Sequence, residues 1–181
     1  MATVTPPDTV ADEPLYEVVD GEVVEKPAMG AYSTWLASIF HDALSPWVRE
    51  RQLGRVVTEM LFRINRAKDL QRRPDVAFVS FERWPQHQPI PDEPAWDVVP
   101  DLAIEVVSRS NSAAEVQVKI RDYFKAGVRQ VWVVYPTTRE VYAFDSPTSV
   151  RILERANVLD GTPLLAGFLF PLASLFEDET G

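Results

Sequence analysis

One stretch in the second half of the chain constrains the fold most, because it reads as strand, helix, strand. It begins with the apolar run DLAIEVVS (101–108) and ends with VWVVY (131–135). Between them, Ser112 and Glu115 form a capping box that starts a predicted helix, and Gly127 stops it. A crossover of this length predicts a right-handed βαβ unit, with two parallel strands and a helix covering one face of the sheet.

The remaining chain predicts further strands, a hairpin and a second helix. The segment LYEVVDGEVV (15–24) surrounds an Asp-Gly pair, which predicts an N-terminal β-hairpin. Apolar residues at three- and four-residue spacing from Tyr32 to Trp47 predict a helix that Pro46 kinks or ends, with Gly54 as the stop signal. Further strands are predicted over residues 55–64, 74–80, 141–144 and 150–153. This order predicts an α/β fold with a mixed sheet flanked by helices.

Length, charge and cysteine content limit the classes of protein. The 181 residues predict a single domain over 15–181, preceded by a flexible arm over 1–14. A net charge of −9 disfavours coating of nucleic acid by bulk positive charge, so any such contact must be weak or local. The absence of cysteine excludes thiolate sites, and two histidines exclude a His-rich metal site. Without a signal peptide or a long apolar segment, the chain is predicted to be cytoplasmic and to make no membrane contact.

Acidic residues interrupt the apolar strands. Glu105 lies inside the strand at 101–108, where an unpaired buried carboxylate is costly. Because strand side chains alternate, Asp101 and Glu105 share one face. Asp75 stands at the head of another apolar run, PDVAFVS (74–80). These acids therefore need cationic partners or a metal.

Lys119 is the one cation of the following helix that we expect to reach the sheet. The inward stripe of that helix is centred on Val116, Ile120 and Tyr123, and Lys119 lies on its flank. Rises of about 3.3 Å per strand residue and about 1.5 Å per helix residue bring Lys119 level with Glu105 when the helix folds back. The residues of this helix predicted to face water are Arg121, Asp122 and Lys125.

Two interpretations of this constellation stay open at this point. Two carboxylates and a lysine are used in metal-dependent phosphodiester hydrolysis, in which the acids hold Mg²⁺ or Mn²⁺ and the cation orients water. The alternative is an internal ion pair between Glu105 and Lys119 that fixes the helix to the sheet.

Ordered motifs over nearly the whole chain resemble the PD-(D/E)XK nuclease superfamily, and more narrowly its Uma-two branch of bacterial restriction-endonuclease-like proteins. The segments that carry the resemblance are YEVVDGEVVE (16–25), RRPDVAFVS (72–80), PDLAIEVVS (100–108), KIRDYFKAGVRQVWVVYP (119–136) and LFPLASLF (169–176). The resemblance implies a restriction-endonuclease-like α/β core, DNA cleavage that depends on Mg²⁺ or Mn²⁺, and a bacterial cytoplasmic setting.

The resemblance also implies roles for single residues. Asp75 matches the aspartate of the superfamily's Pro-Asp element, and Glu105 matches its second acid, so both would bind metal. The backbone carbonyl of Val106 is similar in position to a further metal ligand. Where the family pattern has its lysine this chain has valine, and Lys119 with Tyr123 resembles a helix-borne K-x-x-x-Y arrangement that would take over the catalytic role.

Other polar residues are weaker candidates. Glu59 would be an additional metal-site carboxylate, although an ion pair with the neighbouring Arg55 or Arg63 is an equal alternative. Arg72 and Arg73 are predicted phosphate contacts. The acids expected to be only solvated are Glu17 and Glu22, and the histidines expected to have no catalytic role are His41 and His87.

The Pro-rich segment 81–100 is predicted to be one long loop without regular structure. It supports a second hypothesis, in which the chain is an inactive nuclease-fold module for binding or assembly. A regulatory homodimer would then use Trp84 and Trp96 of this loop as its contact surface.

Overall fold

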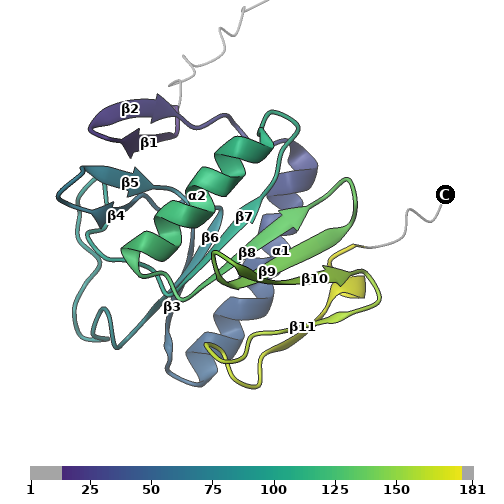
Figure 1. Ribbon diagram of the computed structural model, residues 1–181. Coiled ribbons are helices and arrows are strands. Elements are labelled where there is room, and N and C mark those ends of the chain that lie inside the picture. Colours follow the sequence, from purple (N-terminus) through teal and green to yellow (C-terminus); the bar gives the residue numbers. More distant parts are fainter. Residues whose placement is uncertain (1–13, 177–181) are drawn as a thin grey trace, which may run out of the picture.

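The core of the protein is a six-stranded mixed sheet, seen in a computed structural model that describes residues 14–176 (Figure 1). Its strand order is β10-β9-β8-β7-β6-β3, and only β7 and β8 are parallel neighbours. The bounds are β3 Gly54–Thr58, β6 Val76–Ser80, β7 Leu102–Val106, β8 Gln130–Tyr135, β9 Glu140–Ser146 and β10 Ser149–Glu154. The predicted α/β class and the parallel βαβ unit are confirmed.

Two helices cover opposite faces of this sheet (Figure 1). Helix α1 (Ala31–Glu50) packs on the face that carries Leu102 and Ile104 of β7, together with the C-terminal aromatic residues. Helix α2 (Ala113–Ala126) packs on the other face, which carries Ala103. A strand buried on both faces has no polar side, which explains why β7 is apolar at every position except Glu105.

Smaller sheets complete the fold. The predicted N-terminal hairpin is confirmed, and it belongs to a second sheet with the order β2-β1-β5-β4. The bounds are β1 Tyr16–Val19, β2 Glu22–Glu25, β4 Phe62–Asn65 and β5 Leu70–Arg72. At the other end of the chain, β11 (Val158–Asp160) pairs with β12 (Leu169–Pro171), and a short 3-10 helix covers Leu172–Ser174.

Helix α1 does not end at Pro46, and Gly54 does not stop it. Pro46 lies on the exposed side of the helix, while Leu44 and Val48 on either side of it are buried, so the helix continues through the proline. Gln52 takes the left-handed turn after the helix, with φ of 53°. Gly54 is instead the first residue of β3, where a Cβ atom would lie 2.1 Å from the carbonyl oxygen of Val79.

The single strand predicted over 55–64 is two strands in different sheets. The break is at Glu59, which has a left-handed backbone with φ of 51° and whose N–H donates to the carbonyl of Asp75 at 3.2 Å. Residues on both sides of the break are apolar, so the hydrophobic pattern alone does not reveal it. The break matters for the site, because it turns the Glu59 side chain toward the N-terminal hairpin.

The predicted loop 81–100 contains no helix or named strand, but its tryptophans are not a free contact surface. Trp96 is 1% exposed and stacks on Phe62 at a centroid distance of 5.7 Å. Trp84 is half-buried and meets Trp96 edge to face at 5.4 Å. The loop therefore wraps one edge of the chain's own core. The expectation that Trp96 is part of a homodimer contact surface is wrong, because its side chain is buried.

The predicted arm over 1–14 lies outside the described residues except for Pro14, and a single domain over 15–181 stays a prediction. Within residues 14–176, neither helix is both long and apolar enough to cross a membrane.

Candidate functional site

Two acidic side chains lie opposite each other on neighbouring strands. The antiparallel strands β6 and β7 pair Val76 with Ile104, and the N–H of Asp75 donates to the carbonyl of Ile104 at 3.0 Å. Asp75 thus extends the ladder by one residue and faces Glu105 on the α2 side of the sheet. These residues are only 2% and 8% exposed. Like charges so placed repel each other, so the pair requires cations beside it.

The Asp75 carboxylate accepts hydrogen bonds on two sides. Its Oδ2 accepts from the backbone N–H of Val106 at 2.6 Å, and its Oδ1 accepts from Nζ of Lys26 at 2.7 Å. Lys26 also donates to Oε2 of Glu59 at 2.9 Å and to the carbonyl of Arg73 at 3.1 Å. Burial raises the pKa of Asp75, and the Lys26 ammonium offsets only part of that rise. Burial lowers the pKa of Lys26, but the surrounding carboxylates raise it by more than burial lowers it. Lys26 is therefore charged.

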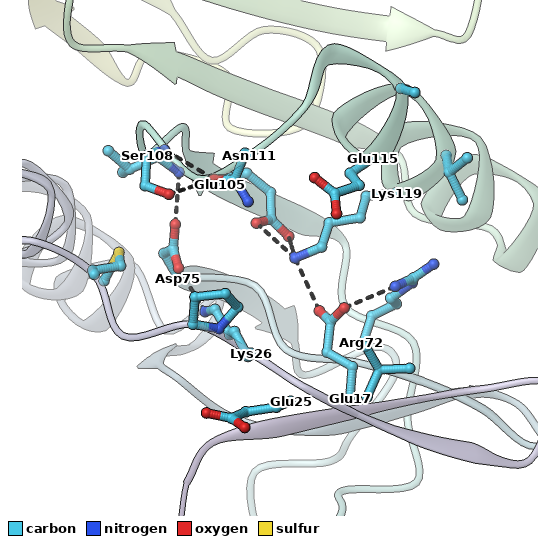
Figure 2. A pocket seen from close by; sticks show the side chains of 16 residues that line it. Glu17, Glu25, Lys26, Arg72, Asp75, Glu105, Ser108, Asn111, Glu115 and Lys119 are labelled. Atoms are coloured by element: carbon cyan, nitrogen blue, oxygen red, sulfur yellow. Dashed lines mark hydrogen bonds and ion pairs between the residues drawn. The ribbon is translucent and has the colours of Figure 1, made fainter.

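Glu105 is held from helix α2. The phenol of Tyr123 donates to Oε1 of Glu105 at 2.5 Å. Figure 2 shows Lys119 beside Glu105, with Nζ 3.2 Å from Oε2. Burial raises the pKa of Glu105, Lys119 opposes that rise, and Asp75 adds to it. The predicted height of Lys119 is therefore confirmed.

The local sequence of α2 explains why Lys119 arrives at this level. The Ser112 hydroxyl accepts from the N–H of Glu115 at 3.2 Å, and the Glu115 carboxylate accepts from the N–H of Ser112 at 2.7 Å. This capping box fixes the first turn. Val116 and Ile120 then pack into the core on the α2 side of the sheet and leave Lys119 at its margin.

Glu17 of β1 joins the cluster, contrary to the expectation that it is only solvated. It is 5% exposed, its Oε1 lies 3.0 Å from Nζ of Lys119, and its Oε2 accepts from Nη1 of Arg72 at 2.7 Å. Burial alone would raise the pKa of Glu17, but Lys119 and Arg72 hold it below its usual value. The Lys119 ammonium therefore bridges two carboxylates, from β1 and β7. Glu22, on the same hairpin, is exposed as expected.

The two arginines predicted as phosphate contacts are bound inside the protein. Arg72 is 5% exposed and donates to Oδ2 of Asp122 through Nε at 3.1 Å and Nη2 at 2.5 Å. Arg73 donates to the backbone carbonyls of Tyr16 and Glu59. Contact of these two arginines with a phosphate stays a prediction. The expectation that Asp122 faces water is wrong, because Asp122 pairs with Arg72.

These side chains surround a pocket of about 310 Å³ between the N-terminal hairpin and α2 (Figure 2). Its floor is formed by Asp75, Glu105 and Val106 of the central strands. The acidic residues in its lining are Glu17, Glu25, Asp75, Glu105 and Glu115, and the basic ones are Lys26, Arg72 and Lys119. We call this cavity the acidic pocket. A dication entering it would meet hard carboxylate oxygens, which are the ligands that Mg²⁺ and Mn²⁺ prefer.

The structure brings together the main residues singled out from the sequence. Asp75, Glu105, Val106 and Lys119 line the acidic pocket. Tyr123 does not line it, because the phenol is fully buried behind Glu105. Glu59 lies outside the lining and pairs with Lys26 rather than with the arginines of its own strand region, so the predicted ion pair with Arg55 or Arg63 is wrong. The histidines, His41 and His87, are absent from the lining.

The donor set fits one divalent ion that keeps several waters. Among residues 14–176, no group of three or more acidic, histidine or cysteine side chains has an arrangement that could hold a metal. Asp75 and Glu105 alone face each other across the strands, and Mg²⁺ commonly binds through one or two carboxylates plus water and substrate oxygens. Burial raises the pKa of both acids, and Lys26 and Lys119 offset only part of that rise.

Two members of the cluster, Lys26 and Glu17, were missed from the sequence. Lys26 follows the second hairpin strand and has no pattern around it, and Glu17 was expected to be solvated because acids on a hairpin usually are. The pairing of β1 with β5 brings Glu17 beside Arg72, and the sequence does not reveal this pairing.

Comparisons with known proteins identify the family and the fold. The family model Uma2, described as "Putative restriction endonuclease", matches residues 6–173. Among solved structures, the chain is similar to a "putative nuclease belonging to DUF820" from Anabaena variabilis, with 19% identity, 90% of each chain covered and a TM-score of 0.74. At this identity the likeness shows the fold, which is restriction-endonuclease-like. No curated protein matches the chain.

Proposed function

The chain belongs to the Uma2 family, and we propose that it is an endonuclease that hydrolyses DNA phosphodiester bonds with Mg²⁺ or Mn²⁺. The observation that carries this proposal is the cross-strand pair of Asp75 and Glu105 at the floor of a pocket, with the ammonium of Lys119 3.2 Å from Glu105. A buried like-charge pair is costly for a fold, and although Lys26 and Lys119 each pair with one of the acids, a bound dication would add a charge that both acids share.

Asp75 and Glu105 would hold the ion, with the carbonyl of Val106 as a further ligand. When bound, the ion polarises the phosphate and lowers the pKa of water. The N–H of Val106 fixes one oxygen of Asp75, and Tyr123 fixes one oxygen of Glu105. Both carboxylates are therefore oriented before any ligand arrives.

Lys119 would be the catalytic cation. Its pKa is raised by Glu105 and Glu17 despite the burial that lowers it, so it stays charged at neutral pH. From its place beside Glu105 it would donate a hydrogen bond to the attacking water and offset the negative charge that builds up at phosphorus. Tyr123 is a positioning residue, because it touches only the carboxylate of Glu105 from the buried side.

The acidic surface sets the expected mode of DNA binding. With a net charge of −9, the chain repels phosphates over most of its surface, so its affinity for DNA rests on contacts near the site. We expect weak binding with a shallow dependence on salt.

The test of this proposal compares the native chain with Asp75→Asn. Mn²⁺ binding is measured by calorimetry at neutral pH, and cleavage of a plasmid is measured with Mn²⁺ and with EDTA. We expect the native chain to bind Mn²⁺ and to nick the plasmid only with metal, and Asp75→Asn to lose both activities. Asparagine keeps the acceptor for Val106 N–H, so the fold should persist.

The matched control is Glu25→Gln, which removes an acid from the same pocket lining without touching Asp75 or Glu105. Unfolding curves for all three proteins show whether each is folded. If the native chain binds no Mn²⁺ at millimolar concentration, the proposal is overturned, and the ion pairs serve the structure of a nuclease-fold binding module.

A further inference from the structure

A second pocket, of about 670 Å³, lies beside the acidic pocket. The first turn of α1, including Tyr32 and Ser33, forms one side of it, and the loop after β7, with Ser108 and Arg109, forms another. Ser108 lines both pockets, which places them next to each other. We call this cavity the α1 pocket.

The first turn of α1 presents backbone N–H groups to the α1 pocket. The N-cap is Gly30, no side chain caps the helix, and no acidic residue lies in its first turn. The first intrahelical bond is donated by Thr34, to the carbonyl of Gly30 at 3.0 Å. The N–H groups of residues 31–33 therefore lack helical acceptors, and the helix dipole adds partial positive charge there. Such a helix start binds phosphate groups readily.

Ser33 gives an independent indication of a ligand. It lines the α1 pocket and is 8% exposed, and its hydroxyl has no hydrogen-bond partner anywhere in the described range. A hydroxyl that lines a pocket and has no protein partner can donate its proton to a ligand there.

The charge of the α1 pocket is opposite to that of its surroundings. Five acidic residues line the acidic pocket, whereas no acidic residue lines the α1 pocket. Arg109 is the one charged residue in its lining, and Arg109 forms no ion pair within residues 14–176. In a chain with a net charge of −9, a cavity with a free guanidinium, hydroxyls and helix N–H groups selects an anion.

We propose that the α1 pocket binds a backbone phosphate of a DNA strand. This phosphate would be next to the one that is cleaved in the acidic pocket. This inference rests on the proposed function for the identity of its ligand. Arg109 would pair with the phosphate, and Ser33 and the first-turn N–H groups would donate hydrogen bonds to it. Because the pockets meet at Ser108, one strand would run from the α1 pocket into the acidic pocket, which supplies the local contact that the acidic surface otherwise lacks.

The test is binding of a short single-stranded DNA in EDTA, where no cleavage occurs. Fluorescence anisotropy gives affinities for the native chain, Arg109→Gln and Ala31→Pro. Proline at the first helical position removes one N–H and keeps the helix, because Gly30 before it has the extended backbone that precedes proline, with ψ of 158°. The control is Arg49→Gln, which removes the same charge from the last turn of α1.

We expect both pocket variants to bind at least about threefold more weakly, and Arg109→Gln to lower the salt slope by about one. The control should bind like the native chain. In a parallel NMR titration, the DNA should shift the amides of residues 31–33. Equal affinity of all four proteins, or no shift of these amides, overturns the inference.

Two further results separate this inference from its neighbours. Inorganic phosphate is titrated in parallel, and if it shifts the amides while DNA does not, the pocket is a site for free phosphate and the inference is wrong. If DNA binds as expected but is never cut with Mn²⁺, the α1 pocket is supported and the proposed nuclease activity fails. If DNA is cut and the pocket variants bind it like the native chain, only the α1 pocket fails.

Discussion

The ammonium of Lys26 lies 2.7 Å from Oδ1 of Asp75, on the outer side of the carboxylate whose other oxygen is bound to the main chain. It also reaches Glu59, at 2.9 Å, and its side chain is only 9% exposed. The protein thus places a cation of its own against the acid that we propose binds metal. Lys26 neutralises part of the charge that attracts the ion, and at the same time it stabilises the metal-free fold.

These two effects predict opposite responses to Lys26→Met. Without metal, we expect the free energy of unfolding to fall by about 3 kcal/mol, because two carboxylates lose a buried partner. The affinity for Mn²⁺ should rise about tenfold, because one competing positive charge is gone. Denaturant unfolding and calorimetry measure the two quantities, and Lys68→Met, at an exposed turn, is the control. A fall in Mn²⁺ affinity in a folded variant would show that Lys26 does not compete with metal.

Lys119→Met should separate binding from chemistry. Because Lys119 neutralises part of the charge of Glu105, as Lys26 does for Asp75, we expect Mn²⁺ binding to be retained or to become tighter. Plasmid cleavage should fall about a hundredfold or more, since the variant lacks the cation that offsets charge at phosphorus. Lys125→Met, on the exposed side of the same helix, should leave both unchanged. Cleavage at the native rate by Lys119→Met would remove Lys119 from the catalytic machinery.

Glu17→Gln should alter stability in acid. Glu17 has a folded pKa below its ordinary value of 4.5, because Lys119 and Arg72 outweigh the effect of burial. Its ionised form therefore stabilises the fold above pH 4.5, and that contribution is lost as pH falls through the lower, folded pKa.

The difference in unfolding free energy between the native chain and Glu17→Gln should thus be largest near neutral pH and shrink below pH 4.5. Urea unfolding at a series of pH values measures it. Asp75 titrates with the opposite sign in both proteins, and the pKa of Glu105 should fall in Glu17→Gln, because Glu17 contributes to its rise. A difference that is constant with pH would mean that Glu17 has an unshifted pKa.

Trp96→Ala should lower stability rather than change the oligomeric state. Trp96 is 1% exposed and stacks on Phe62, so its truncation should cost about 3–5 kcal/mol of unfolding free energy. Thermal unfolding and light scattering measure the two properties. A stable variant whose apparent mass in solution falls by half would instead support a dimer built on loop 81–100.

Much of the site followed from local patterns. The capping box at Ser112 and the rise per residue placed Lys119 level with Glu105, because both quantities depend only on positions near in sequence. The resemblance to the nuclease family identified Asp75 as a candidate metal ligand, and it too rests on residues adjacent in sequence. Lys26 could not be found like this, since its partners Asp75 and Glu59 are 49 and 33 residues away and no periodicity connects them.

The errors had a common physical cause. Pro46 was expected to kink or end α1, and the helix does not end there, because the position is exposed and its neighbours are buried. The strand over 55–64 read as one run, because apolar residues stand on both sides of Glu59. In each case local propensity was correct as a tendency and was overridden by packing.

The sequence by itself determined the βαβ unit, the hairpin and the acids that interrupt apolar strands, because alternation and capping are properties of adjacent residues. Only the tertiary structure decided which cations those acids meet. Glu17 and Lys26 come from the hairpin region, Lys119 from α2 and Asp75 from the head of β6, and ion pairs between such distant segments form only when packing fixes their distances. The same packing buried Arg72 and Trp96 inside the protein and left Arg109 available for a ligand.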